Sequence, residues 1–337
     1  MAHILTVTMN PAIDIWTSVA KVEPTRKLRC GPARLDPGGG GINVARVARR
    51  LGAEATALFP SGGATGQLLE RLVSEEGLKS VVVPIKEETR EDFTARETST
   101  GEEFRFVLPG PFLSEAEWRR CLEAFATFQE PVDFVVASGS LPPGVPDDFY
   151  ARLAEIARDR KTPFAVDGSG PPLEAALARG VDVVKPSLQE LRDLTAKELL
   201  DDASRVGACE DLIQSGQARA VALTLGGQGA MLVTAEGAWR ADPLPVTVIG
   251  AVGAGDSFLG AMLFSMACGD TMEESFHHAV AAASAALLAP GTQLCNPEQL
   301  RDLYEHVVVE RLRRGPQIRR GSASLQLSAA LSAPDRG

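Results

Sequence analysis

Residues 251–257 read Ala-Val-Gly-Ala-Gly-Asp-Ser, which places one carboxylate, Asp256, directly after a glycine-rich turn. An apolar run with helical spacing continues from Ser257 and predicts a buried helix. The amides of Gly253–Gly255 would be unpaired first donors of this helix, and its dipole favours a phosphate there. Asp256 would then take the proton of a hydroxyl that attacks the phosphorus. The alternative is that Asp256 is only a helix N-cap.

A run of four glycines, Gly38–Gly41, precedes Ile42 and Asn43 at the start of a second predicted helix. Consecutive glycines let the backbone pass within hydrogen-bonding distance of a ligand, and Asn43 can donate and accept toward hydroxyl groups. A mobile glycine loop is the alternative. Asp14 follows the first predicted strand, at the sheet edge where open α/β sheets bind ligands, and suits a polyol. It could equally stabilise a turn.

An anionic substrate needs nearby cationic side chains, and four candidates lie in segments 15–36 and 86–107. They are Lys27, Arg29, Arg90 and Arg105. Arginine binds phosphate through bidentate charge-assisted bonds. Each of these residues taken alone is better explained as a solvated surface charge.

Two further turns could serve a nucleotide. Thr224-Leu-Gly-Gly-Gln-Gly229 closes a predicted strand and is either a phosphate cradle or a hairpin. Ser187 and Glu190 have the spacing of a capping box, S-x-x-E, which is the preferred reading. In the first turn of a helix, Glu190 could also hold a magnesium-bound water.

Composition narrows the possible functions. The chain has 337 residues, 45% of them hydrophobic, and a formal charge of −10, which argues against a nucleic-acid-binding surface. Five scattered cysteines favour neither a zinc site nor a disulfide framework. The start of the chain lacks a signal-peptide pattern, and the longest apolar run, residues 279–289, is too short to span a bilayer. We therefore expect a cytoplasmic protein without nucleic-acid or membrane partners.

Short β-branched runs alternate with helical patterns through most of the chain. This alternation predicts an α/β fold with a mostly parallel sheet covered by helices on both faces. After the hairpin at residues 230–241, we expect three helices to about Arg313. Residues 315–337 lack periodicity and are predicted to be a disordered tail, so that the folded domain spans residues 1–314.

Segments 15–36 and 86–107 break the alternation and have the character of short strands. We expect them to pair into a small sheet, here called the lid, over the ligand site. Its edges would invite a second subunit and give a homodimer. Two unrelated surface hairpins are the alternative.

The polyglycine run with Asn43, the turn at residues 224–229 and the Gly-Ala-Gly-Asp sequence at 253–256 together resemble the signatures of the ribokinase-like (PfkB) carbohydrate kinases. The resemblance covers residues 1 to about 310 and implies a three-layer ribokinase-like fold. Within the family, residues 37–46, 62–66 and 138–144 most closely resemble the minor-type 6-phosphofructokinases. The implied enzyme is a phosphotransferase with an alcohol acceptor, moving the ATP γ-phosphoryl to the 1-hydroxyl of fructose 6-phosphate.

The resemblance also implies a role for individual residues. The catalytic group would be Asp256, with Gly253, Ala254 and Gly255 as the anion hole. The sugar phosphate would be held by Asp14, Gly38, Gly39, Asn43, Arg90, Ser140 and, from a partner subunit, Lys27. The ATP side would be lined by Lys185, Ser187, Thr224, Gly226, Gly227, Gly229 and Ser284, with Glu190 for Mg²⁺.

One motif and one loop depart from the family pattern. Ser187 stands where the family's N-x-x-E motif has asparagine, and Ala289 and Gln293 replace more polar or basic residues in a loop that often binds a monovalent cation. A potassium requirement is therefore left open. Tagatose 6-phosphate or fructose 1-phosphate remains an alternative substrate, and a non-catalytic sugar-phosphate sensor is the alternative from another class.

Overall fold

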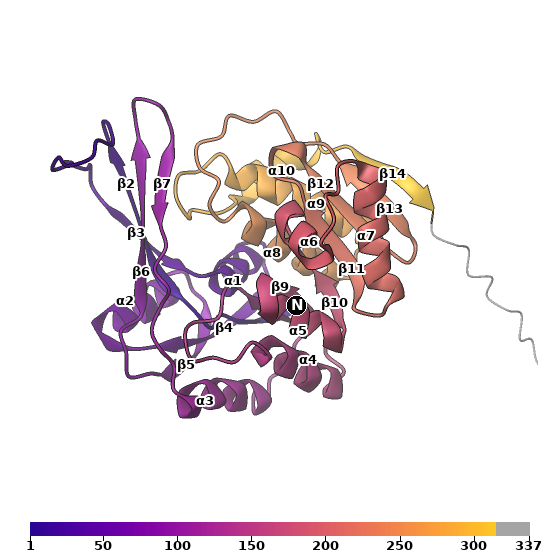
Figure 1. Ribbon diagram of the computed structural model, residues 1–337, viewed down its shortest axis with the longest axis horizontal. Coiled ribbons are helices and arrows are strands. Elements are labelled where there is room, and N and C mark those ends of the chain that lie inside the picture. Colours follow the sequence, from indigo (N-terminus) through magenta and orange to yellow (C-terminus); the bar gives the residue numbers. More distant parts are fainter. Residues whose placement is uncertain (315–337) are drawn as a thin grey trace, which may run out of the picture.

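The computed structural model describes residues 1–314 and contains two sheets (Figure 1). The larger sheet has ten strands in the order β14-β13-β12-β11-β10-β9-β8-β1-β4-β5. Its strands are β1 (His3–Val7), β4 (Glu54–Ser61), β5 (Lys79–Pro84), β8 (Phe134–Ser138), β9 (Phe164–Asp167), β10 (Val181–Val184), β11 (Ala218–Thr224), β12 (Ala230–Thr234), β13 (Gly237–Ala241) and β14 (Val309–Arg314). Pairs from β5 to β11 are parallel, and those from β11 to β14 are antiparallel.

Helices cover both faces of this sheet, because its central strands are apolar on both sides. In β8, Phe134 and Val136 pack into one core, whereas Val135 and Ala137 pack into the other. The first core is closed by α1 (Gly40–Arg50), α2 (Gly63–Glu75), α8 (Ala254–Cys268), α9 (Met272–Ala286) and α10 (Pro297–Tyr304). The second is closed by α3 (Glu115–Ala126), α4 (Phe149–Asp159), α5 (Gly170–Arg179), α6 (Leu188–Thr195) and α7 (Asp202–Gln214). The predicted three-layer α/β architecture is confirmed.

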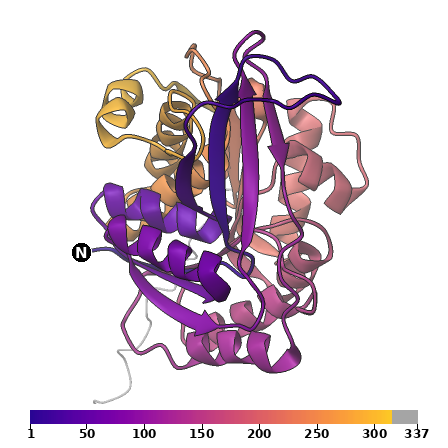
Figure 2. The same cartoon turned by 90° about the vertical axis from the view of Figure 1, so that its left-hand side faces the viewer.

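The second sheet is the lid, with strand order β3-β2-β6-β7. Its strands are β2 (Ala12–Val19), β3 (Arg34–Gly38), β6 (Arg90–Glu97) and β7 (Glu103–Phe106). They stand beside the main body, as Figure 2 shows face-on. The two segments thus pair with each other as expected, through parallel strands β2 and β6.

The end of the domain differs from the expectation. Instead of helix to about Arg313, α10 ends at Tyr304 and β14 adds an edge strand beside β13. The reason is tertiary, because the open edge of β13 offers unpaired backbone groups, and the pairing they provide overrides a weak local preference. Strand β5 is a further element that the sequence pattern did not predict. The predicted tail, residues 315–337, lies outside the described residues.

None of the helices within residues 1–314 has the length and apolar character needed to cross a membrane.

Candidate functional site

Helix α8 starts in a conformation that requires glycine. Gly253 has φ +79°, and a Cβ there would lie 2.4 Å from Leu294 Cδ2. The helix therefore begins at Ala254, three residues before the predicted start, which puts Asp256 in its first turn. The amides of Gly255 and Asp256 have no acceptor within the helix, as at every helix start, so they remain available to an anion.

The side chain of Asp256 is held from α1. Asn43 Nδ2 donates to Asp256 Oδ2 at 2.9 Å. Burial raises the pKa of Asp256, while the Asn43 hydrogen bond and the charge of Lys185 act in the opposite direction. The late carboxylate therefore lies in direct contact with the helix that follows the polyglycine run, and its role as the base stays a prediction.

The polyglycine turn is packed tightly against the protein itself. A Cβ on Gly38 would lie 2.5 Å from the Asp14 carboxylate, and one on Gly40 would lie 2.3 Å from Ser138 Oγ. Gly39 has φ +106°. All four glycines are therefore dictated by neighbours or by φ, since a Cβ on Gly41 would also lie 2.4 Å from Thr8 Oγ1. This close packing favours an ordered turn over a loose glycine loop.

Asp14 lies on the inner face of the lid. Its directly paired neighbours are Asp36 on β3 and Asp92 on β6, so three buried carboxylates share this face. Burial raises the pKa of Asp14 to about 6, with Arg105 opposing the rise and Asp92 adding to it. A carboxylate kept in this setting is costly for the fold, which is typical of a functional position.

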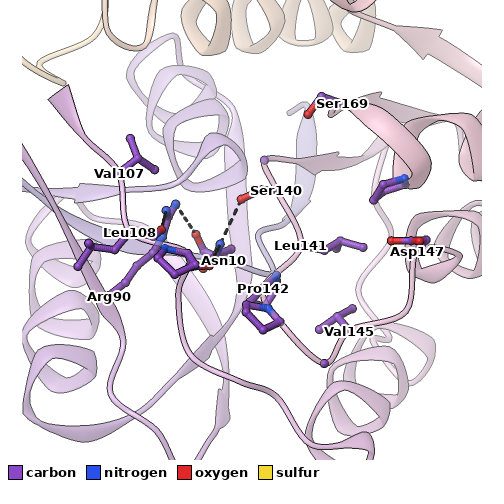
Figure 3. Close-up of a pocket in the computed structure, with 15 residues that line it drawn as sticks. Asn10, Arg90, Val107, Leu108, Ser140, Leu141, Pro142, Val145, Asp147 and Ser169 are labelled. Atoms are coloured by element: carbon purple, nitrogen blue, oxygen red, sulfur yellow. Dashed lines mark hydrogen bonds between the residues drawn. The ribbon is translucent and has the colours of Figure 1, made fainter. Parts of the chain in front are cut away.

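A second group of predicted residues surrounds a cavity of about 660 Å³ (Figure 3). Arg90 donates to the carbonyl oxygens of Leu108 at 2.6 Å and Asn10 at 3.1 Å. Asn10 Nδ2 in turn donates to Ser140 Oγ at 3.1 Å. Arg90 and Ser140 are thus brought together as predicted. Arg90 Nε is buried and has no hydrogen-bond partner among the described residues.

Asp256 does not line this cavity. The two regions adjoin through Gly139, which lines the cavity and whose amide nitrogen would lie 3.1 Å from a Cβ on Gly40. The site therefore has, on one side of the polyglycine turn, a pocket whose charged lining residues are Arg90 and Asp147, with Arg90 also 3.4 Å from Asp92 Oδ1. On the other side it has a carboxylate with helix-start amides.

Lys185 and Asp167 form a buried ion pair behind the start of α8. Their Nζ–Oδ1 distance is 3.1 Å, and Lys185 Nζ lies 3.4 Å from the position of a Cβ on Gly255. Burial raises the pKa of Asp167 to about 6, against the attraction of Lys185. Burial alone would lower the pKa of Lys185, but Asp167, Asp256 and Glu190 together raise it.

The predicted nucleotide residues gather at the ends of β10 and β11. Ser187 and Thr224 form a parallel bridge, and Thr224 donates from its amide to the Pro186 carbonyl oxygen at 3.0 Å. The capping box is confirmed: Glu190 Oε2 accepts from the Ser187 amide at 2.7 Å, and Ser187 Oγ accepts from the Glu190 amide at 3.2 Å.

The glycines after Thr224 form a tight turn into β12, as the hairpin interpretation predicts. A Cβ on Gly226 or Gly227 would meet no atom within 4 Å, so these two positions face open space. Gly229 has φ +92° and packs against the Ala241 carbonyl. Ser284 is buried on α9, and its hydroxyl donates to Val280 O at 2.9 Å. Lys27 is exposed on the β2–β3 loop and does not line the cavity of Figure 3.

The sequence reasoning missed Asp167, Asn10 and Arg46, which all contact predicted site residues. Asp167 ends β9 at the carboxyl edge of the sheet, so its position along the chain was an available signal. In residues 1–314 no group of three or more His, Cys, Asp or Glu side chains is arranged to hold a metal ion. Mg²⁺ that is shared with phosphates needs only one or two carboxylates, so Glu190 and Asp167 remain compatible with it.

The comparisons with known proteins agree with this geometry. Residues 7–299 match the family described as pfkB family carbohydrate kinase. The ATP-dependent 6-phosphofructokinase isozyme 2 of Mycobacterium tuberculosis is 45% identical over 303 residues, covering 90% of this chain and 89% of the relative. The isozyme 2 of Escherichia coli K12 is 39% identical, covering 91% and 99%. The 1-phosphofructokinase of Bacillus subtilis is 30% identical, covering 92% and 100%.

Solved structures give the same result. The Escherichia coli phosphofructokinase-2 in complex with fructose 6-phosphate superimposes with a TM-score of 0.85 at 38% identity, covering 91% of this chain and 99% of that one. The same enzyme has been solved with potassium (TM-score 0.86) and as a tetrameric inhibited form (TM-score 0.85). The chain is therefore a sugar kinase of the pfkB family of carbohydrate kinases.

Proposed function

We propose that this kinase transfers the γ-phosphoryl group of ATP to the 1-hydroxyl of fructose 6-phosphate, giving fructose 1,6-bisphosphate. The observation that carries the proposal is the Asn43–Asp256 hydrogen bond, which places the candidate base beside the polyglycine turn. The pocket at Arg90 and Ser140, across that turn, offers a guanidinium and a hydroxyl for the 6-phosphate. The 39–45% identity to 6-phosphofructokinase isozyme 2 supports the choice of sugar.

Each group has a defined task in this reaction. Asp14 accepts hydrogen bonds from the sugar hydroxyls and Asn43 donates to them. Gly38 and Gly39 let the turn pack directly against Asp14 and Thr8, which holds it beside the proposed sugar site. Asp256 accepts the proton of the attacking hydroxyl. The transition state of phosphoryl transfer is loose, so the hydroxyl becomes acidic late, and a carboxylate is a sufficient base.

The migrating phosphoryl group is stabilised at the start of α8. The amides of Gly255 and Asp256, which have no acceptor within the helix, would donate to it, each such donor being worth about 3 kcal/mol in related acyl-transfer sites. Gly253 and Ala254 complete the predicted anion hole, although the Ala254 amide already donates to Ala251 O at 3.4 Å. Lys185 adds a full charge behind them. Mg²⁺, when bound through Glu190 or Asp167, supplies charge neutralisation between the phosphates of ATP. Thr224, Gly226, Gly227 and Gly229 border the space for the nucleotide, with Ser187 beside them and Ser284 below.

The proposed homodimer uses the outer face of the lid. Leu35, Ile15, Phe93 and Phe106 are direct cross-strand partners, so they form one apolar row across all four strands. Their exposure reaches 57% at Phe106. An apolar row of this kind on a solvent-facing sheet marks an interaction surface. A second copy would bring its Lys27 toward the phosphate pocket.

The experiment is a coupled assay with Mg-ATP and a panel of fructose 6-phosphate, tagatose 6-phosphate and fructose 1-phosphate, with the product identified by ³¹P NMR. We expect kcat/KM for fructose 6-phosphate to exceed the other two by about tenfold or more. A higher value for another phosphosugar would reassign the substrate. Sugar-phosphate binding without turnover would identify a sensor instead of an enzyme.

A further inference from the structure

One buried guanidinium joins the parts of this site. Arg46 is on α1, one turn after Asn43, and its side chain is fully buried. Its Nη1 donates to three oxygens: Pro37 O at 3.1 Å, Asn43 Oδ1 at 3.2 Å and Thr292 O at 3.0 Å. Its Nη2 donates to Glu76 Oε1 at 2.7 Å. Burying a charge this completely is costly unless all its partners are fixed.

The bond to Asn43 has a directional consequence. A carboxamide has one accepting and two donating positions, so fixing its oxygen also fixes its nitrogen. Because Arg46 can only donate, it holds Asn43 Oδ1 on its own side, and Nδ2 must then face Asp256. The reversed amide would place Oδ1 against the carboxylate of Asp256 and the NH₂ group against the guanidinium, and both contacts are repulsive.

The other two hydrogen bonds of Arg46 Nη1 fix the guanidinium, and with it the orientation of the Asn43 amide, relative to the surrounding backbone. Pro37 O is the last carbonyl before the polyglycine turn, and Thr292 O belongs to the loop between α9 and α10. Glu76 and Asp36 both oppose the charge of Arg46, with Asp36 Oδ1 3.8 Å from Nη2, whereas Nε has no hydrogen-bond partner among the described residues. Glu76 is also shared with Arg50, whose Nη2 lies 3.0 Å from Glu76 Oε2. Glu76 thus stabilises Arg46 without touching Asn43 or Asp256.

We infer that Arg46 is a positioning residue for the phosphoryl transfer, because it sets the amide orientation through which Asn43 holds the base Asp256. The inference rests on the proposed function. Arg46 would thus affect the rate of phosphoryl transfer without contacting the substrate. Its ion-pair partner Glu76 would affect only the stability of the fold.

A double-mutant cycle tests this inference. In the otherwise unchanged chain, Arg46→Met should lower kcat about 20-fold, the size expected for losing one hydrogen bond to a charged group. In an Asn43→Ala background, the same change should lower kcat less than about threefold, because the amide that Arg46 orients is absent. Equal losses in the two backgrounds would overturn the inference. The cycle uses whichever phosphosugar the wild-type chain phosphorylates best, so a wrong substrate assignment appears as a changed substrate and not as additivity.

Glu76→Gln is the matched control. It removes the charge partner of Arg46 and should lower the melting temperature while leaving kcat within about threefold. If Arg46→Met does not fold, Arg46→Lys replaces it in the cycle, since it keeps the charge beside Glu76 but cannot form the three-way contact of Nη1. A loss of kcat in Glu76→Gln as large as in the Arg46 variant would show that Arg46 acts only through stability.

The pH profile gives an independent readout. The charged groups acting on Asp256 are Lys185 after β10, Asp14 on β2 and Arg105 on β7, and all remain in the Arg46 variants. Loss of the oriented Asn43 bond should therefore move the acidic limb of kcat to higher pH in Arg46→Lys, where the charge is retained. An unmoved limb in a folded, impaired Arg46→Lys variant would contradict the inference.

Discussion

Asn43 Nδ2 lies 2.9 Å from Asp256 Oδ2, although 213 residues separate the two side chains along the sequence. The contact joins the first helix after the polyglycine turn to the helix that carries the candidate base. It also holds one carboxylate oxygen, and in the proposed reaction the other would accept the proton of the acceptor hydroxyl. The predictions below depend on this arrangement.

The pH at which kcat falls on the acidic side should depend on the charge of Lys185. Asp256 acts as a base only when deprotonated, so kcat should be present above its pKa and lost as the pH falls through it. The positive charge of Lys185 lowers the pKa of Asp256 against the effect of burial. Lys185→Met should therefore shift the limb of kcat, measured at saturating ATP, to higher pH and raise the KM for ATP. Lys79→Met, at an exposed ion pair with Glu54, should leave the limb in place.

The buried carboxylate of Asp14 should lower the free energy of unfolding at neutral pH, although it is needed for sugar binding. Its pKa rises from 3.8 to about 6 on folding, so the folded protein binds the proton more tightly than the unfolded chain. Stability is then lost as the pH rises from about 4 to about 6, by on the order of 3 kcal/mol. Asp14→Asn should be more stable than wild type above pH 6, with equal stability below pH 4, while its KM for the phosphosugar rises.

Urea unfolding of Asp14→Asn at several pH values checks this prediction. Asp302→Asn, at an exposed position on α10, is the control and should follow the wild-type pH dependence. A stability difference for Asp14→Asn that is independent of pH would contradict the proposed cause.

Gly40 should not tolerate a side chain. The Cβ of Gly40→Ala would lie 2.3 Å from Ser138 Oγ and 3.1 Å from the Gly139 amide nitrogen, so β8 and the turn would have to separate. We expect a loss of kcat/KM together with a lower melting temperature. Gly207→Ala on α7, where a Cβ meets nothing within 4 Å, should instead raise stability by about 0.5–1 kcal/mol. Unchanged kinetics in Gly40→Ala would show that this contact does not shape the site.

The lid dimer predicts complementation between two impaired variants. In a mixture of Lys27→Ala and Asp256→Asn chains, heterodimers would contain one site with an intact Asp256 and a Lys27 supplied by the partner. Activity per intact Asp256 should therefore exceed that of Lys27→Ala alone. Phe106→Lys, in the exposed apolar row, should give a folded monomer by light scattering and abolish the complementation. Additive activities would place Lys27 outside the partner's site.

Most of the architecture could be predicted because the sequence patterns that indicate its helices and strands are local. Alternating apolar segments predicted the three layers, and two segments of strand character predicted the lid. Strand β14 could not be predicted in this way, since its pairing depends on the edge that β13 offers far away in sequence. Arg46 was missed for the same reason, because its role comes from a contact with Asn43 that only the fold creates. Asp167 could have been found from its place at the end of a predicted strand, although its pairing with Lys185 could not.

The proposed phosphoryl transfer depends most directly on Asp256 as the base. The decisive measurement combines the kcat of Asp256→Asn with the Kd of this variant for fructose 6-phosphate, determined by titration calorimetry. Asparagine keeps the shape of the side chain but is not a base. The account predicts that kcat falls about a thousandfold or more while the sugar-phosphate Kd stays within about threefold of wild type. Near-normal turnover of the folded variant would contradict the account.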